Sequence, residues 1–225
     1  MPMLSDFISL FFPQYCSGCN ALLIQSEKAI CSSCFIELDR FKCQTAKNKF
    51  VFGRIEVEEY VSAFDLIKDS VLHKILHNVK YRNDKKSANI LGIELGKRIK
   101  QLKLHNKIEC IIPVPISKKK LKRRKFNQSE EIAKGMSQII TAPVETNWLM
   151  RKNNLKSQTF SSRLQRAANV KEEYYLNKKK TLQQKCLLII DDIVTTGATI
   201  QSCLEVINKD EYSIYIASVA KTQKD

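Results

Sequence analysis

The sequence predicts an α/β protein with a mostly parallel sheet, helices on both faces of that sheet, and a small metal-binding module at the N-terminus. Short apolar runs alternate with segments of helical periodicity after residue 50, as in β-α-β units. Two Cys-x-x-Cys pairs lie near the start, and an apolar run ends in two aspartates followed by threonines and a glycine. We therefore expect a module at residues 1–45 and an α/β domain at residues 50–225.

The cysteine pairs have the spacing of a structural zinc site. Eleven residues separate the second cysteine of the first pair from the first of the next, and Gly18 allows a tight turn inside the first pair. The expected zinc ligands are Cys16, Cys19, Cys31 and Cys34. A redox dithiol or four unrelated core cysteines are the alternatives, and Cys43 is a possible substitute ligand. The other cysteines, within apolar patterns, are expected to be buried small residues: Cys110, Cys186 and Cys203.

Periodicity also predicts the elements of the larger domain. Strands are expected at 61–66, 108–114, 144–150, 185–190 and 212–220, and helices at 71–79 and 129–140. His73 and His77 lie opposite the apolar face of the first helix, without a third metal ligand, and we assign them no role. Crossover connections gather the loops at the strand carboxyl ends, so segments 113–127 and 191–199 should open onto one crevice.

The segment after the strand at 185–190 has the chemistry of a phosphate site. A strand-to-helix junction offers unpaired N–H groups and a positive helix dipole, Gly197 allows close approach, and threonine hydroxyls add donors. The adjacent carboxylates are expected to accept hydrogen bonds from a vicinal diol or to face a phosphate-bound Mg²⁺. Ribose 5-phosphate offers both partners. The candidate residues are Asp191, Asp192, Thr195, Thr196, Gly197, Ala198 and Thr199. A P-loop ATPase is excluded because no Gly-x-x-x-x-Gly-Lys-[Ser/Thr] occurs in the chain.

The chain is strongly basic, with a formal net charge of +15. This charge favours a polyanionic partner, nucleic acid first, although it also fits a chain that is simply kept soluble. A cationic loop precedes the helix at 129–140, where Asn127 and Glu130 resemble a capping box. Pyrophosphate, 5-phosphoribosyl 1-pyrophosphate (PRPP) and nucleic-acid phosphates would each relieve its charge repulsion, and a solvated loop is the alternative. The candidate residues are Lys118, Lys119, Lys120, Lys122, Arg123, Arg124, Lys125, Asn127 and Gln128.

Segment 151–169 lacks clean periodicity and resembles a long mobile loop. Such loops often close over a phosphate-bearing ligand, and the expected contacts are Gln158, Arg166 and Asn169. Simple disorder is the alternative. Near the start, the apolar residues 10–12 are too few for a membrane span and carry no upstream basic charge. We expect a cytoplasmic protein with reduced thiols.

These motifs together resemble the ComF family of competence proteins, relatives of the type I phosphoribosyltransferases. The resemblance rests on Phe-Pro-x-Tyr-Cys-x-x-Cys at 12–19, Pro-Val-Pro at 113–115, Lys-Phe-Asn-Gln at 125–128 and the segment 191–199, along with Gln158, Arg166 and Asn169. It covers nearly the whole chain. Two positions depart from the family's usual pattern, because Lys125 replaces a glycine and Leu155 stands where a threonine is common.

The resemblance implies a phosphoribosyltransferase-like fold in which 191–199 is the PRPP loop, the segment after Pro115 the pyrophosphate loop and 151–169 the flexible loop. It implies a role in natural transformation for a cytoplasmic protein that is peripheral at the inner membrane. The expected ligands are single-stranded DNA, PRPP with Mg²⁺ or a related ribose phosphate, and structural zinc. The expected partner is a DNA-translocation ATPase or an inner-membrane DNA channel. An active Mg²⁺-dependent phosphoribosyltransferase with an unidentified acceptor is the alternative.

Overall fold

The computed structural model describes residues 13–24, 26–43, 50–52, 55–152 and 173–222. Its centre is a four-stranded sheet in the order β3-β8-β7-β4. These strands are β3 (Glu59–Leu66), β8 (Ser213–Thr222), β7 (Cys186–Val194) and β4 (Cys110–Pro113), and every neighbouring pair is parallel. All four carboxyl ends therefore lie along one edge, where ligand loops collect in open α/β sheets.

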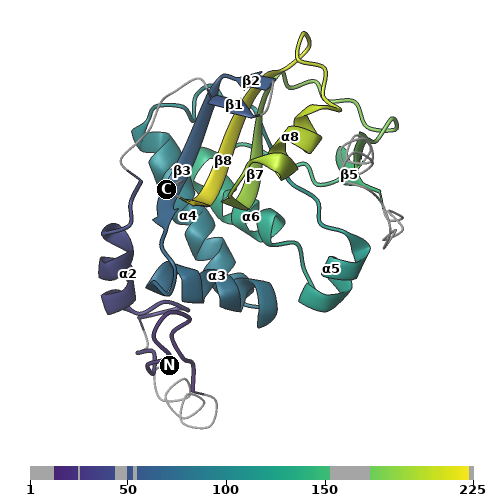
Figure 1. Cartoon of the computed structure of the whole chain (residues 1–225). Coiled ribbons are helices and arrows are strands. Elements are labelled where there is room, and N and C mark those ends of the chain that lie inside the picture. Colours follow the sequence, from purple (N-terminus) through teal and green to yellow (C-terminus); the bar gives the residue numbers. More distant parts are fainter. Residues whose placement is uncertain (1–12, 25, 44–49, 53–54, 153–172, 223–225) are drawn as a thin grey trace, which may run out of the picture.

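Alternate residues of the strands face two separate hydrophobic clusters. Leu188 and Ile190 of β7 belong to the cluster that includes helices α3 (Val71–Tyr81), α4 (Lys85–Gln101) and α6 (Gln128–Ile140). Leu187 and Ile189 belong to the second cluster, which includes helix α8 (Ala198–Leu204). Helices thus cover both faces of a parallel sheet, as predicted, with α8 opposite α4 and α6 (Figure 1).

Helices α4 and α6 approach closely enough for their backbones to touch. A Cβ atom added at Gly92 would lie 2.0 Å from the carbonyl oxygen of Ile132, and one at Gly135 would lie 2.0 Å from that of Asn89. No side chain larger than hydrogen fits at either position, since such contacts lie far inside van der Waals distance. The two glycines therefore set the distance between α4 and α6. This packing positions the start of α6 at the strand ends.

The N-terminal segment packs onto the edge of this domain. Cys16, Cys34 and Leu38 belong to the same hydrophobic cluster as α3 and α4. Asn78 of α3 donates to the main-chain oxygen of Ser17 at 2.8 Å, and the N–H of Cys43 donates to the oxygen of Ala63 in β3 at 3.0 Å. Helix α2 (Ser32–Asp39) lies beside α3 (Figure 1). The proposed division into two domains at residues 45–50 stays a prediction.

Some sequence predictions differ from the structure. The prediction of a strand over residues 144–150 in the main sheet is wrong, because Val144 makes only an isolated parallel bridge to Ile111. The chain then leaves the sheet, and β5 (Leu149–Arg151) pairs with β6 (Tyr174–Leu176) in a separate antiparallel sheet. Another antiparallel pair, β1 (Phe50–Phe52) and β2 (Ile55–Val57), was not predicted, and neither were α2 and α4. The basic loop is in fact a helix, α5 (Lys118–Arg124).

Candidate functional site

The predicted phosphate segment lies at the carboxyl end of β7. The strand runs longer than predicted and includes both aspartates. A turn at Thr195 and Thr196 then leads to Gly197, whose φ of 78° places it in the left-handed region as the residue before α8. Thr195, Thr196, Ala198 and Thr199 are exposed. The predicted threonine hydroxyls therefore lie on an exposed segment, while Gly197 is buried and the N–H of Ala198 donates to the Thr196 hydroxyl at 3.4 Å.

Asp191 is hydrogen-bonded at the start of α6. Its Oδ1 accepts from the Ser129 hydroxyl at 3.0 Å and from the N–H of Asp192 at 2.8 Å. Burial and the neighbouring Asp192 carboxylate raise the Asp191 pKa from 3.8 to about 7, and the two hydrogen bonds only partly oppose this rise. A carboxyl group that titrates near neutral pH at a strand end is typical of a ligand or proton-transfer site.

Asp192 is held in an ion pair that the sequence did not predict. Lys80, in the last turn of α3, places its Nζ 3.0 Å from the Asp192 Oδ2, and these side chains are 20% and 11% exposed. The two aspartates thus have partners on different helices, Asp191 on α6 and Asp192 on α3. Their predicted role toward a diol or a phosphate-bound Mg²⁺ stays a prediction, and the ion pair with Lys80 is an added constraint on Asp192.

The cationic residues after Pro115 form the exposed helix α5 instead of a loop. The Ser117 hydroxyl accepts from the Lys120 N–H at 3.3 Å and caps the helix. Burial, Arg151 and Arg124 lower the Lys120 pKa, while Asp191 and Asp192 partly oppose them. Lys120 is itself exposed at the surface of the helix. The other candidate cations of α5 are mostly exposed: Lys118, Lys119, Lys122, Arg123 and Arg124.

Lys125, at the position of the family's glycine, adopts the glycine-like conformation. It ends α5 with a φ of 68°, a region that is unfavourable for a side chain with a Cβ atom. A lysine in this conformation introduces local strain that a glycine would not have.

Asn127 and Gln128 hold the turn after α5 together. Asn127 donates to the main-chain oxygen of Val114 at 3.1 Å, so the predicted capping box is wrong, because its side chain does not cap α6. Gln128 is buried, donates to the oxygen of Phe126 at 3.2 Å and accepts from Arg124 at 2.8 Å. These contacts join β4, α5 and α6, which indicates that both residues position the basic helix.

The structure adds residues that sequence reasoning missed. Lys80, Tyr81 and Ser129 reach the site from helices. Tyr81 is 55% exposed and lies beside Arg123 and Arg124, whereas Phe126, the aromatic residue nearest the cations in sequence, is buried. The periodicity of α3 marks only its apolar face, so no local signal identifies these side chains.

The four predicted zinc ligands come together. One sulfur atom from each of Cys16, Cys19, Cys31 and Cys34 lies within 4.8 Å of the others. The Sγ atoms of Cys19 and Cys31 are 3.6 Å apart, close to the roughly 3.8 Å expected between thiolates bound to tetrahedral zinc. The residues therefore fit the metal. Cys43 is buried outside this cluster.

The first turn favours a thiolate at Cys16, whereas burial raises the pKa of Cys31 and of Cys34. The N–H groups of Gly18 and Cys31 donate to the Cys16 sulfur at 3.4 and 3.2 Å. Burial raises the pKa of Cys16, but main-chain N–H groups outweigh it and lower the pKa to about 7. A Cβ atom at Gly18 would lie 2.8 Å from the Cys34 sulfur and 2.5 Å from a methyl carbon of Val71. The first knuckle therefore requires a glycine.

Other predicted residues have mixed outcomes. Cys110 and Cys203 are buried as expected, whereas Cys186 is only partly buried. His77 is exposed and contacts the Tyr81 ring, and His73 pairs with Asp69. The flexible-loop candidates lie outside the described residues: Gln158, Arg166 and Asn169. No helix in the described part of the chain is long and apolar enough to cross a membrane.

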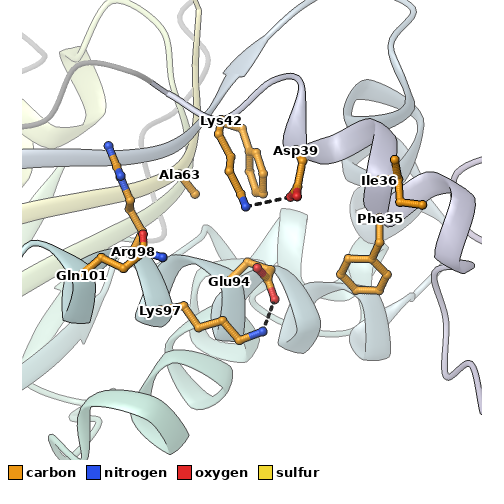
Figure 2. A pocket seen from close by; sticks show the side chains of 10 residues that line it. Phe35, Ile36, Asp39, Lys42, Ala63, Glu94, Lys97, Arg98 and Gln101 are labelled. Atoms are coloured by element: carbon orange, nitrogen blue, oxygen red, sulfur yellow. Dashed lines mark hydrogen bonds and ion pairs between the residues drawn. The ribbon is translucent and has the colours of Figure 1, made fainter.

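A cavity of about 380 Å³ lies away from these residues, between α2, β3 and α4. Figure 2 shows its charged side chains, of which Lys42 pairs with Asp39 at 2.8 Å and Lys97 with Glu94 at 2.7 Å. It contains none of the predicted site residues. Since its charges are partly satisfied within the wall, we do not place the candidate site there.

The chain is similar to two groups of known proteins. It is 24% identical to competence protein F of Haemophilus influenzae over 215 residues, which cover 88% of this chain and 93% of that protein. It is 27% identical to the DNA utilization protein YhgH of Shigella flexneri and of Escherichia coli K12 over 135 residues, 57% of each chain. No family model matches the chain. The chain is therefore a homologue of competence protein F, and its resemblance to the ComF family is confirmed.

Proposed function

We propose that this protein takes part in DNA uptake during natural transformation by binding single-stranded DNA and a ribose phosphate, PRPP first among them. The names of its relatives support the general role in competence and DNA use. The observation that carries the ligand proposal is the row of exposed threonines after β7, which follows Asp191 at the carboxyl end of that strand.

The proposed cradle, these threonines with the main chain around Gly197, suits a terminal phosphate. Thr195, Thr196 and Thr199 are exposed, and Gly197 brings the main chain close to the ligand. Asp191, beside the cradle, would accept a hydrogen bond from a ribose hydroxyl, and Lys120 would face the diphosphate. When bound, Mg²⁺ would neutralise the charge of the PRPP diphosphate. Asp191 would be the carboxylate to hold it, because Asp192 is already paired with Lys80.

Calorimetric titration of PRPP with Mg²⁺ tests the ribose-phosphate proposal. We expect measurable binding that weakens by about tenfold or more in Thr196→Val, Thr199→Val double-substituted protein, which loses two hydroxyl donors. Thr181→Val is the matched control, because Thr181 is exposed and precedes the amino end of β7. Equal affinities in all three proteins would contradict the proposed cradle.

The same edge of the molecule suits a DNA backbone. Helix α5 carries six exposed or partly exposed cations and no acidic residue. Phosphate contacts release counterions, so binding weakens as salt rises, with a logarithmic slope of roughly −0.7 per contact on a single strand. About four contacts would give a slope near −3.

Fluorescence anisotropy with a labelled oligothymidine at several salt concentrations tests the DNA proposal. Substituting Lys118, Lys119 and Lys122 with Gln should reduce affinity and flatten the slope by about 2. Substituting Lys107, Lys178 and Lys209 with Gln removes the same charge from exposed positions elsewhere and is the control. A wild-type affinity that does not change with salt would exclude this mode of binding.

A second candidate function is phosphoribosyl transfer to an unidentified acceptor. The observation that favours it is the Asp191 carboxyl group, because a pKa of about 7 suits proton transfer at neutral pH. Release of pyrophosphate from PRPP, measured with a panel of bases and amines, tests it. Turnover that Asp191→Asn abolishes would support transfer. Binding without turnover for any acceptor would leave a ligand site only.

We further propose that zinc has a structural role and that the N-terminal module is a separate folding unit of residues 1–45. All four ligand positions are filled by cysteine, so no position is open for a substrate. A cytoplasmic location, peripheral at the inner membrane, and contact with a DNA-translocation ATPase or DNA channel complete the proposal. Fractionation of transforming cells, with crosslinking to membrane proteins, tests the last two points.

A further inference from the structure

We propose that the DNA strand leaves α5 across the exposed ring of Tyr81 and enters a groove between the zinc knuckle and the junction of α3 and α4. This inference rests on the proposed binding of single-stranded DNA and assigns its path and its base-stacking residue. It depends on two features, an aromatic platform at the end of α3 and a cationic groove beside it.

The platform is the ring of Tyr81 with its neighbours. The ring is 55% exposed, and the His77 ring, one turn earlier, lies 4.8 Å away between centroids. The guanidinium carbons of Arg123 and Arg124 lie 5.6 and 5.9 Å from the Tyr81 centroid. An exposed aromatic ring flanked by guanidinium groups combines a surface for a base with partners for the adjoining phosphates.

The groove has a volume of about 470 Å³ and lies next to this platform. Tyr15, 54% exposed, provides a second aromatic ring on its zinc-knuckle wall. Arg82, Lys85 and Lys86 also line the groove, and the Lys86 ammonium group donates to the Gln14 side-chain oxygen at 3.1 Å. The Asp84 carboxylate in the same wall caps α4 by accepting from the Ser87 N–H at 3.0 Å. The groove therefore carries three cations against one carboxylate, and its volume falls within the range of small-molecule sites.

The two features are joined in the structure. Tyr81 ends α3, and Arg82 follows it directly and lines the groove. Lys85 of the groove lies 5.6 Å from the centroid of the Phe126 ring, immediately after α5. Cations thus continue from α5 to the knuckle, with exposed tyrosines between them. Alternation of charge and exposed rings suits a single strand, since the bases of a duplex are stacked on one another and cannot reach a ring.

Oligonucleotide binding by full-length, zinc-loaded protein tests this path. Tyr81→Ala should weaken binding of an oligothymidine about tenfold and have little effect on an abasic strand of the same length, because only stacking is lost. Tyr81→Trp should retain affinity and show fluorescence quenching on binding. The natural tryptophan, Trp148, is buried and should contribute a constant background. Tyr175→Ala, at an exposed tyrosine of β6, is the matched control.

The outcomes separate this inference from the function on which it rests. If the wild-type protein binds no oligonucleotide, the DNA proposal fails and the path fails with it. If wild-type and α5-substituted proteins differ as expected but Tyr81→Ala and Tyr175→Ala both bind like wild type, only the path is overturned. Equal losses on normal and abasic strands would also overturn it, because the loss would then not come from stacking. Lys85→Gln, Lys86→Gln protein should show a smaller salt slope with its fold intact.

Discussion

Replacing Lys80 with Met should destabilise the protein through the carboxylate that it leaves behind. Lys80 and Asp192 are 3.0 Å apart, with side chains 20% and 11% exposed. Breaking a fully buried pair costs about 3–5 kcal/mol and an exposed pair less than about 1. At this partial burial we expect a loss of about 2–3 kcal/mol in the free energy of unfolding, or roughly 5–10 °C in Tm for a chain of this size.

Urea unfolding followed by far-UV circular dichroism measures this loss. Adding Asp192→Asn to Lys80→Met removes the unpaired charge and should recover most of the lost stability. The control is Lys97→Met, which breaks the surface pair of Lys97 and Glu94 and should change the free energy of unfolding little. Additive effects of the two substitutions would refute the reasoning.

Four further perturbations test the zinc site, the helix contact, the strained turn and the buried acid. Removing zinc with a chelator should lower Tm by many degrees, and a colorimetric assay should find one zinc per chain that Cys19→Ser abolishes and Cys186→Ser preserves. Gly135→Ala should destabilise by about 1–3 kcal/mol in urea unfolding, although glycine-to-alanine changes normally stabilise helices, because its Cβ meets the Asn89 oxygen. Lys125→Gly should stabilise by about 0.5–1 kcal/mol, whereas Lys122→Gly inside α5 should destabilise. Because the Asp191 pKa is raised from 3.8 to about 7, the folded state binds an extra proton between these values; stability should fall as pH rises through this window, and less so in Asp191→Asn.

Local patterns accounted for much of the fold and failed at identifiable places. The strands at 61–66 and 212–220 and the helix at 71–79 matched β3, β8 and α3 within two or three residues, because burial on a sheet or helix face leaves a clear periodicity. At 144–150 the prediction failed because Val144 bridges to the sheet edge at Ile111 and the chain then turns away. The run of cations suggested a loop, yet Ser117 caps it into a helix.

The sequence by itself determined the features that depend on spacing along the chain. Two cysteine pairs gave the metal cluster, and an apolar strand followed by acids, threonines and glycine gave the exposed threonine segment after β7. Only the tertiary structure decided which distant side chains meet these features. Lys80 pairs with Asp192, Ser129 binds Asp191 and Tyr81 lies beside the arginines of α5. Such contacts depend on how α3 and α6 pack across the strand ends. The sequence shows which face of a helix is apolar, but it does not show which side chains of other elements that helix will contact.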